Sequence, residues 1–310
     1  LMDAQTLKKQ LGFRLFPSKL DINLDENKDI LYIGIEASSV CDNMQQDSSA
    51  FEGWIFCIYA PMQDKIKQVE LSWQIPDEKD KNTHYNRFLY RVIKMQQHFN
   101  WFSVASDNFQ ELAAFRNRYK DVKLVLNQPR VAGKQTDFKE KTEAFFERAF
   151  MDEKQFYKGI QFDSFNHQLP VGLFLDSVSQ NSSIFPGNKG AIDLWGIRKD
   201  EFWIFELKFN NSKVGILSEI LFYLWIMEDL FFTRKIAYDP SGKSNTIRDL
   251  NRVYDLAQTG ISKLHGVLLT DKLHPYIDNR VIDFINKTNQ ESRILLLVQM
   301  YKPRITVKLL

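Results

Sequence analysis

Two carboxylates and an ammonium group could form one reactive site in the second half of the chain. Asp193 and Glu206 are separated by twelve residues, and Lys208 lies two positions after Glu206. Two acids that face each other repel, and they are costly in an apolar setting unless a positive charge lies between them. A divalent metal ion with a lysine beside it supplies that charge, because carboxylate oxygens suit hard cations such as Mg²⁺. The chemistry expected of such a group is metal-assisted hydrolysis.

The surrounding residues predict a β-hairpin that brings these groups together. Both flanks are rich in aromatic and β-branched residues, and the fully charged stretch between them is typical of a solvated tip. If Ile197 pairs with Phe202 across the tip, counting outward places Asp193 opposite Glu206. Directly opposed residues share a face, and Lys208 shares it as well. The alternative is an exposed Glu-x-Lys on a strand with an unrelated Asp opposite it. The apolar surroundings and this register favour a functional site over that alternative.

A helix is expected before the hairpin. Apolar residues recur at helical spacing from residue 138 to 149, after Thr136 or Asp137 as the capping residue. Glu143 and Glu147 lie beside the buried stripe of this helix. On the sequence alone each is more often an ordinary surface glutamate than a member of a site.

The elements after the hairpin predict the fold class. A long helix is expected from about residue 214 to 231, and short strands at 266–270 and 293–301 enclose a helix at 275–286. A further strand at 170–176 is expected to enter the site region. This order of elements predicts an α/β sandwich around a mixed sheet.

The pattern resembles the PD-(D/E)XK nuclease superfamily. The residues that carry the resemblance are an Ile-Asp pair at Asp193, a gap of twelve residues, and the triplet Glu-Leu-Lys from Glu206 to Lys208. The match covers about residues 137 to 301, and an isoleucine stands where the motif's name has proline. The resemblance implies a restriction-endonuclease-like core in which Asp193 and Glu206 bind Mg²⁺, or Mn²⁺ in its place. Lys208 would position or activate the attacking water.

The resemblance implies further members of the site. Many relatives place another acid on the helix before the hairpin, where we slightly prefer Glu143 to Glu147 as a catalytic residue and metal ligand. Some relatives carry a Gln and Tyr pair on the helix after the hairpin. Glu219 and Tyr223 have that spacing, one helical turn apart. A glutamate therefore stands in place of the glutamine, and the pair is expected to support the metal ligands.

The function implied is Mg²⁺-dependent hydrolysis of phosphodiester bonds. We expect a DNA endonuclease of the restriction, defence or repair type, with RNA as the second choice of substrate and a homodimer as an open alternative. A catalytically inactive nucleic-acid-binding or scaffold module with the same fold is an alternative function. Residues 237–244 approximate a phosphate-binding loop with Lys243, but the first glycine is missing, so an NTPase is the weaker alternative.

The first 130 residues are predicted to form a separate α/β domain, with a role in recognition or assembly, before a nuclease-like domain at 135–310. Strands at 30–35, 53–59 and 66–73 are expected to form a small antiparallel sheet. The helix that follows carries basic residues on the face opposite its apolar stripe: Arg87, Arg91 and Lys94. These could contact nucleic-acid phosphates, although a solvated helix face is the more usual explanation.

Composition excludes several classes of protein. The chain has 310 residues, 44% of them hydrophobic, which allows a sizeable buried core. Its formal net charge is only +2, so nucleic-acid binding would need a local basic surface. The sequence shows no secretory signal and no apolar run that could span a membrane, so we expect a cytoplasmic location. Cys41 and Cys57 lack metal-ligand spacing and are expected to be reduced thiols.

Overall fold

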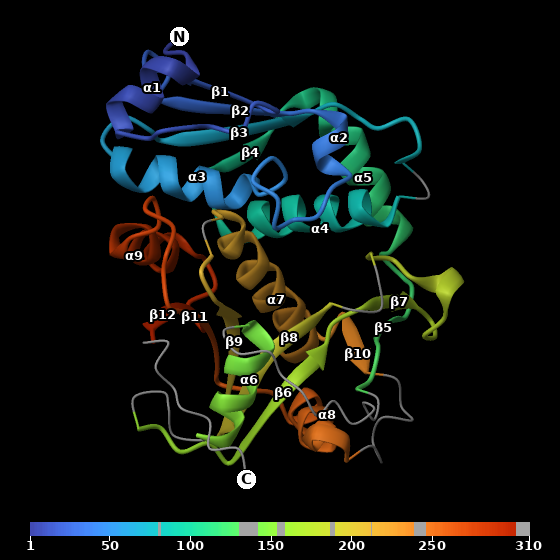
Figure 1. Cartoon of the computed structure of the whole chain (residues 1–310). Coiled ribbons are helices and arrows are strands. Elements are labelled where there is room, and N and C mark those ends of the chain that lie inside the picture. Colours follow the sequence, from blue (N-terminus) through green and yellow to red (C-terminus); the bar gives the residue numbers. More distant parts are fainter. Residues whose placement is uncertain are drawn as a thin grey trace. The chain divides into compact units, whose positions relative to one another are not determined.

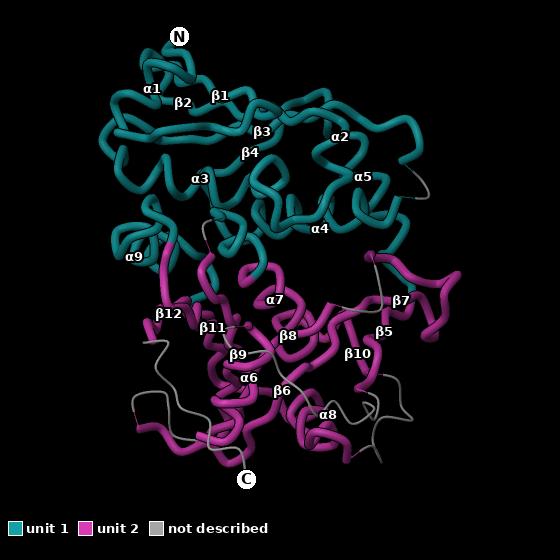
Figure 2. Tube along the Cα trace, in the orientation of Figure 1, with its two compact units in different colours: residues 1–122, 213–219, 274–292 teal, residues 123–212, 220–273, 293–310 magenta. Residues whose placement is uncertain are grey.

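The chain has a mixed α/β fold that divides into two compact units. The computed structural model describes residues 1–79, 82–129, 142–153, 159–186, 190–211, 213–238 and 246–301. Unit 1 comprises residues 1–122, 213–219 and 274–292, and unit 2 comprises residues 123–212, 220–273 and 293–310 (Figure 2). The division therefore differs from the expected split at residues 130–135, because two later segments belong with the N-terminal residues.

Unit 1 is built on a four-stranded sheet in the order β1-β2-β3-β4. Its strands are β1 (Leu20–Asp25), β2 (Ile30–Ile35), β3 (Gln68–Trp73) and β4 (Phe102–Val104). Only β1 and β2 pair in the antiparallel direction, whereas β2, β3 and β4 run parallel. The predicted antiparallel sheet is therefore wrong, because β2 and β3, which correspond to two of its strands, run parallel with a helical connection between them.

Helices cover the sheet of unit 1. Its helices are α1 (Ala4–Leu11), α2 (Ala37–Val40), α3 (Phe51–Tyr59), α4 (Thr83–His98), α5 (Phe109–Arg118) and α9 (Asn279–Thr288). Both α3 and α4 pack on the same side of the strands (Figure 1), where the ring of Phe51 contacts Phe102 and that of Phe88 contacts Trp73. The strand predicted at 53–59 is wrong, since this segment is α3. Every residue of α3 is buried, so its sequence lacks the polar face that marks a helix.

Two of the three basic residues of α4 do not lie on the predicted solvated or phosphate-contacting face. Arg91 is 1% exposed and Lys94 is 2% exposed. Arg91 Nε donates a 2.7 Å hydrogen bond to Glu52 of α3, and its Nη2 donates to the carbonyl oxygen of Ser49 at 2.8 Å. Arg87 is half-buried. The expectation is therefore wrong for Arg91 and Lys94, because both side chains are buried. An arginine that neutralises a buried glutamate is also not available to a nucleic acid.

Unit 2 is built on a five-stranded mixed sheet in the order β12-β11-β9-β8-β6. Its strands are β6 (Ser164–Pro170), β8 (Ala191–Arg198), β9 (Glu201–Lys208), β11 (Lys263–Thr270) and β12 (Ile294–Met300). The strands β6, β8 and β9 are antiparallel, and β9, β11 and β12 are parallel. The predicted mixed sheet with flanking helices is confirmed at this level.

A smaller sheet accompanies it. Its three strands follow the order β10-β5-β7: β10 (Ile236–Tyr238), β5 (Leu124–Leu126) and β7 (Leu173–Leu175). The strand expected at 170–176 corresponds to β7, so it does not enter the main sheet. The strand next to β8 in the main sheet is β6 instead. Its central residues Asn-His-Gln are polar, so the sequence pattern does not indicate a strand there.

Two helices cover opposite faces of the main sheet. The helix α6 (Glu143–Asp152) packs Phe146 and Phe150 against Phe205 and Leu207 of β9. On the other face, α7 (Gly215–Phe231) brings Leu224 against Gly266 (Figure 1). Thr142 caps α6 by accepting a hydrogen bond from Phe145 N–H, whereas the capping residues expected at 136 and 137 lie outside the described residues. The remaining helix of the unit, α8 (Leu250–Thr259), follows a 3₁₀ turn, η6 (Ile247–Asp249).

Other expectations concern the whole chain. Over the described ranges, no helix combines the length and apolar character needed to cross a membrane.

Cys41 and Cys57 are free thiols, and burial raises the pKa of the Cys57 thiol. Cys57 therefore stays protonated and unreactive in the folded chain.

Candidate active site

The β8–β9 hairpin has the register that the sequence predicts. Ile197 pairs with Phe202, and the ladder of paired residues ends at Leu194 and Phe205. The next positions along the two strands are Asp193 and Glu206. Because side chains alternate, Glu206 and Lys208 face away from Phe205, which packs in the hydrophobic cluster under α6.

The strand β8 parts from β9 at Asp193 but stays with β6. Leu194 is paired on both sides, with His167 of β6 and Phe205 of β9. Pairing with β6 resumes one step further, where Ile192 meets Leu169. The ladder between β8 and β9 does not resume. The separation of these strands gives the Asp193 side chain room to reach backbone and side-chain groups on either neighbour.

The Asp193 carboxylate is held from two sides. Its Oδ2 accepts a 3.0 Å hydrogen bond from the backbone N–H of Leu207, next to Glu206 on β9. Its Oδ1 lies 3.5 Å from Nε2 of Gln168, on β6. Two donors on two strands fix the plane of the carboxylate beside the Glu-Leu-Lys triplet.

Glu206 and Lys208 form a buried ion pair. Lys208 Nζ donates to Oε1 of Glu206, and the two residues are 8% and 1% exposed, respectively. They share a sheet face with Phe202, whose ring packs against Phe231 of α7. Burial of either charge alone would be strongly unfavourable, and each compensates the other. The pair therefore orients the carboxylate of Glu206 inside an apolar environment.

The two glutamates of α6 have different hydrogen-bond partners near the hairpin. Glu147 Oε2 accepts a 2.6 Å hydrogen bond from Gln168 Nε2, the same nitrogen that lies near Asp193. Its other oxygen is 2.6 Å from Nδ1 of His167. Glu143 Oε1 instead accepts a 3.3 Å hydrogen bond from the backbone N–H of Phe209. The structure thus connects Glu147 to Asp193, and it places Glu143 at the end of β9.

Three residues that contact the predicted site residues were not predicted from the sequence. His167 and Gln168 lie in the polar centre of β6, and no motif marks them. Tyr301 follows β12 and donates a 3.0 Å hydrogen bond from its hydroxyl to the carbonyl oxygen of Lys208. Burial raises the pKa of Tyr301, and the nearby acids Asp271 and Glu143 raise it further. Its hydroxyl stays protonated and can hold the end of β9 in place.

The pair predicted on α7 is divided between the units. Glu219 belongs to unit 1, where its Oε1 accepts a hydrogen bond from Gln45 Nε2. Tyr223 belongs to unit 2 and is buried. Their predicted support of the metal ligands stays a prediction.

The donor set of the hairpin fits Mg²⁺. Among the described residues, no three His, Cys, Asp or Glu side chains form a group that could hold a metal ion. Mg²⁺ does not need such a group, because it usually keeps several waters and binds proteins through one or two carboxylates together with substrate phosphates. Asp193 and Glu206 supply two carboxylates at the point where the strands separate.

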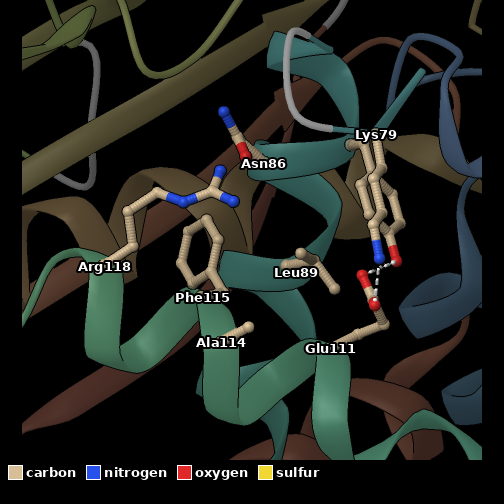
Figure 3. A pocket seen from close by; sticks show the side chains of 8 residues that line it. Lys79, Asn86, Leu89, Glu111, Ala114, Phe115 and Arg118 are labelled. Carbon is tan, nitrogen blue, oxygen red and sulfur yellow. Dashed lines mark hydrogen bonds and ion pairs between the residues drawn. The ribbon is translucent and has the colours of Figure 1, made fainter.

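A cavity in unit 1 is separate from these residues. It lies between α4 and α5, where Lys79 Nζ forms a 2.5 Å ion pair with Glu111 (Figure 3). Its volume of about 80 Å³ is well below the roughly 300–1,000 Å³ of small-molecule sites. The residues that line it are Lys79, Tyr85, Asn86, Leu89, Glu111, Ala114, Phe115 and Arg118. We therefore assign no ligand to this cavity.

Comparison with known proteins adds no relative. No protein-family model, curated protein or solved structure matches the chain. Residues 239–244 of the phosphate-binding loop considered at 237–244, with Lys243, lie outside the described residues. The resemblance to the PD-(D/E)XK nucleases rests on Asp193, Glu206, Lys208 and the elements around them.

Proposed function

We propose that unit 2 is a Mg²⁺-dependent nuclease domain with a restriction-endonuclease-like core, and that DNA is its substrate. The observation that carries this proposal is the bond between the Asp193 carboxylate and the backbone N–H of Leu207. This bond places one acid beside the buried Glu206 and Lys208 pair, where β8 separates from β9. An acid, a second acid and a lysine at one point of an apolar sheet are suited to metal-assisted hydrolysis.

The order of elements supports the core that we propose. The hairpin occupies the middle of the sheet, with a glutamate-bearing helix before it and a long helix after it. The parallel strands β11 and β12 extend the sheet on the side of β9. This is the context on which the resemblance to the nuclease superfamily depends.

In the proposed site, Asp193 and Glu206 hold Mg²⁺. When bound, Mg²⁺ supplies charge neutralisation at the phosphate oxygens and a water of lowered pKa. Lys208 lies beside these carboxylates, since its Nζ donates to Oε1 of Glu206 in the present structure. From this position Lys208 would hold the attacking water or stabilise negative charge on the phosphate.

Backbone contacts keep these groups in position during the proposed reaction. The N–H of Leu207 orients Asp193, and the hydroxyl of Tyr301 binds the carbonyl oxygen of Lys208. The aromatic cluster of Phe146, Phe209 and Tyr301 packs beside the end of β9. A rigid support of this kind matters because small displacements of reacting groups lower rates strongly.

One observation favours a second candidate, a noncatalytic nucleic-acid-binding or scaffold module. Lys208 and Glu206 already neutralise each other in the buried pair, so the fold does not need a metal to compensate these charges. The candidates differ in a simple respect. A nuclease turns over substrate with Mg²⁺, whereas a module binds nucleic acid without cleaving it.

The experiment that tests the proposal incubates the purified chain with supercoiled plasmid, linear duplex, single-stranded DNA and RNA. Each substrate is tested with Mg²⁺, with Mn²⁺ and with EDTA. We expect cleavage of DNA in the presence of either metal and none with EDTA. Cleavage that persists in EDTA would contradict the metal site. Binding of DNA without cleavage under all conditions would support the noncatalytic module instead.

A further inference from the structure

We propose that Gln168 is a positioning residue of this site, which fixes the Asp193 carboxylate and connects it to Glu147. This inference rests on the proposed function, because Asp193 is the metal ligand that Gln168 would position. Its Nε2 lies 2.6 Å from Oε2 of Glu147 and 3.5 Å from Oδ1 of Asp193. One amide group thus lies between two carboxylates that come from different elements, α6 and β8.

The backbone of Gln168 has an unusual conformation for a strand residue. Its φ is +49°, in the left-handed region that residues with a Cβ rarely adopt. The residues on either side, His167 and Leu169, pair normally with Leu194 and Ile192. The change of direction is therefore confined to one residue in the middle of β6, opposite Asp193. Such a conformation persists only where surrounding contacts impose it.

The η6 turn supplies contacts that hold this conformation. Arg248 Nη1 donates a 2.8 Å hydrogen bond to the carbonyl oxygen of Gln168. The neighbouring Asp249 accepts hydrogen bonds through Oδ2 from Ser164 and Asn166, at 2.6 and 2.9 Å. Both turn residues also have positive φ angles, +52° for Arg248 and +53° for Asp249. The turn thus binds β6 at three residues, which include Gln168.

The amide of Gln168 offsets the repulsion between the carboxylates of Glu147 and Asp193. Glu147 and Asp193 are both acids, so their ionised carboxylates repel when they approach the same point. An NH₂ group has two hydrogens and can serve an oxygen of each carboxylate. Asp193 Oδ2 is already oriented by Leu207, so a donor at Oδ1 restricts the remaining rotation of the carboxylate. Partners of metal-binding side chains typically change metal affinity by about 10–100-fold.

The test measures Mn²⁺ binding by electron paramagnetic resonance, which requires no catalytic turnover. Gln168→Leu removes the donor while it keeps much of the side-chain volume. Gln168→Gly removes the side chain but suits the positive φ, so we expect it to fold, which circular dichroism checks. The matched control is Gln299→Leu on β12, because among the described residues the amide of Gln299 donates to the neighbouring carbonyl oxygen of Met300 and not to a carboxylate. Asp193→Asn identifies binding at the proposed site.

We expect both Gln168 variants to bind Mn²⁺ about tenfold or more weakly than the wild type, with Gln299→Leu unchanged. The Mn²⁺ spectrum of the remaining complex should also change, because the orientation of a ligand differs. Dissociation constants within twofold of the wild type in Gln168→Gly, a folded variant, would overturn the proposal.

The outcome also separates this inference from the nuclease function. A wild-type chain that binds Mn²⁺ through Asp193 but cleaves no nucleic acid would contradict the nuclease and leave the role of Gln168 to be decided by its variants. A wild-type chain without binding that depends on Asp193 would overturn both.

Discussion

The backbone N–H of Leu207 donates a 3.0 Å hydrogen bond to Oδ2 of Asp193. This bond satisfies a buried strand N–H at the point where β8 has left β9, and it also orients an acid beside Glu206. Asp193 therefore has a structural role as an acceptor and a proposed chemical role as a metal ligand. These roles can be separated by substitution.

Asp193→Asn keeps an acceptor for Leu207 but loses the charge. We expect its melting temperature to stay within a few degrees of the wild type, while Mg²⁺-dependent cleavage falls by about 100-fold or more. Asp193→Leu leaves the Leu207 N–H without this acceptor and should lower the free energy of unfolding by a further ~1–3 kcal/mol. Calorimetry and plasmid cleavage measure the two effects. Equal activity in Asp193→Asn and the wild type would contradict the proposed ligand.

The two glutamates of α6 should differ in their effect on activity. Glu147 shares the Gln168 amide with Asp193, whereas Glu143 accepts a hydrogen bond from the backbone of Phe209. We expect Glu147→Gln to lower the cleavage rate by about 10–100-fold and Glu143→Gln to lower it less. The reverse order would place Glu143 in the site, in line with our slight preference from the sequence. Rates at saturating and limiting Mg²⁺ distinguish a loss of metal binding from a loss of turnover.

Unit 1 should depend on its buried ion pair. Arg91→Leu leaves Glu52 buried without its cationic partner, and we expect a loss of about 3–5 kcal/mol in the free energy of unfolding. Arg116→Leu is the matched control, because Arg116 is exposed and, within the described part of the chain, donates to the Gln96 side chain and not to an acid. The control should change stability by less than about 0.5 kcal/mol. Urea unfolding followed by circular dichroism compares the variants, and similar midpoints for both would refute the assigned role.

His265 should make unit 2 less stable in mild acid. Its ring is 6% exposed and stacks on Trp203 at a centroid distance of 3.7 Å. Burial lowers the pKa of His265 to about 4, although the nearby carboxylate of Glu201 opposes this effect. In the unfolded chain the pKa of histidine is about 6.5, so the unfolded state binds more protons between these values. Stability is therefore fully present above about pH 6.5 and is lost as the pH falls toward 4.

We expect the contribution of His265 to amount to roughly 1–2 kcal/mol between pH 7 and pH 5, after allowance for solvent screening. His265→Phe keeps an aromatic ring beside Trp203 but does not titrate. The difference in unfolding free energy between the two pH values should be smaller in this variant than in the wild type. The same loss in both proteins would show that other groups cause the acid sensitivity.

The hairpin could be predicted because its information is local. A charged tip between two apolar flanks sets the pairing of Ile197 with Phe202, and that pairing sets the positions of Asp193 and Glu206. The helix α7 was predicted for the same reason, since its length and composition are evident in one stretch of sequence. Local patterns thus predicted the centre of the sheet of unit 2.

Features that depend on distant partners could not be predicted. The position of Gln168 depends on a hydrogen bond from the η6 turn, eighty residues later. The strand β6 was not predicted, because the residues next to Gln168 are polar. Arg91 looked like a surface residue because its partner, Glu52, is on another helix. The helix α3 resembled a strand because burial on all sides removed its polar face. In each case a tertiary contact outweighed the local pattern.

The most direct test of the proposed site compares two lysines of the same hairpin. Lys208 is buried against Glu206, whereas Lys199 lies exposed at the tip. Supercoiled plasmid is incubated with Mg²⁺ and the wild type, Lys208→Ala or Lys199→Ala, after circular dichroism has shown that each is folded. We predict cleavage by the wild type and Lys199→Ala, and a rate at least about 100-fold lower for Lys208→Ala. Cleavage by Lys208→Ala at the wild-type rate would contradict the proposed site.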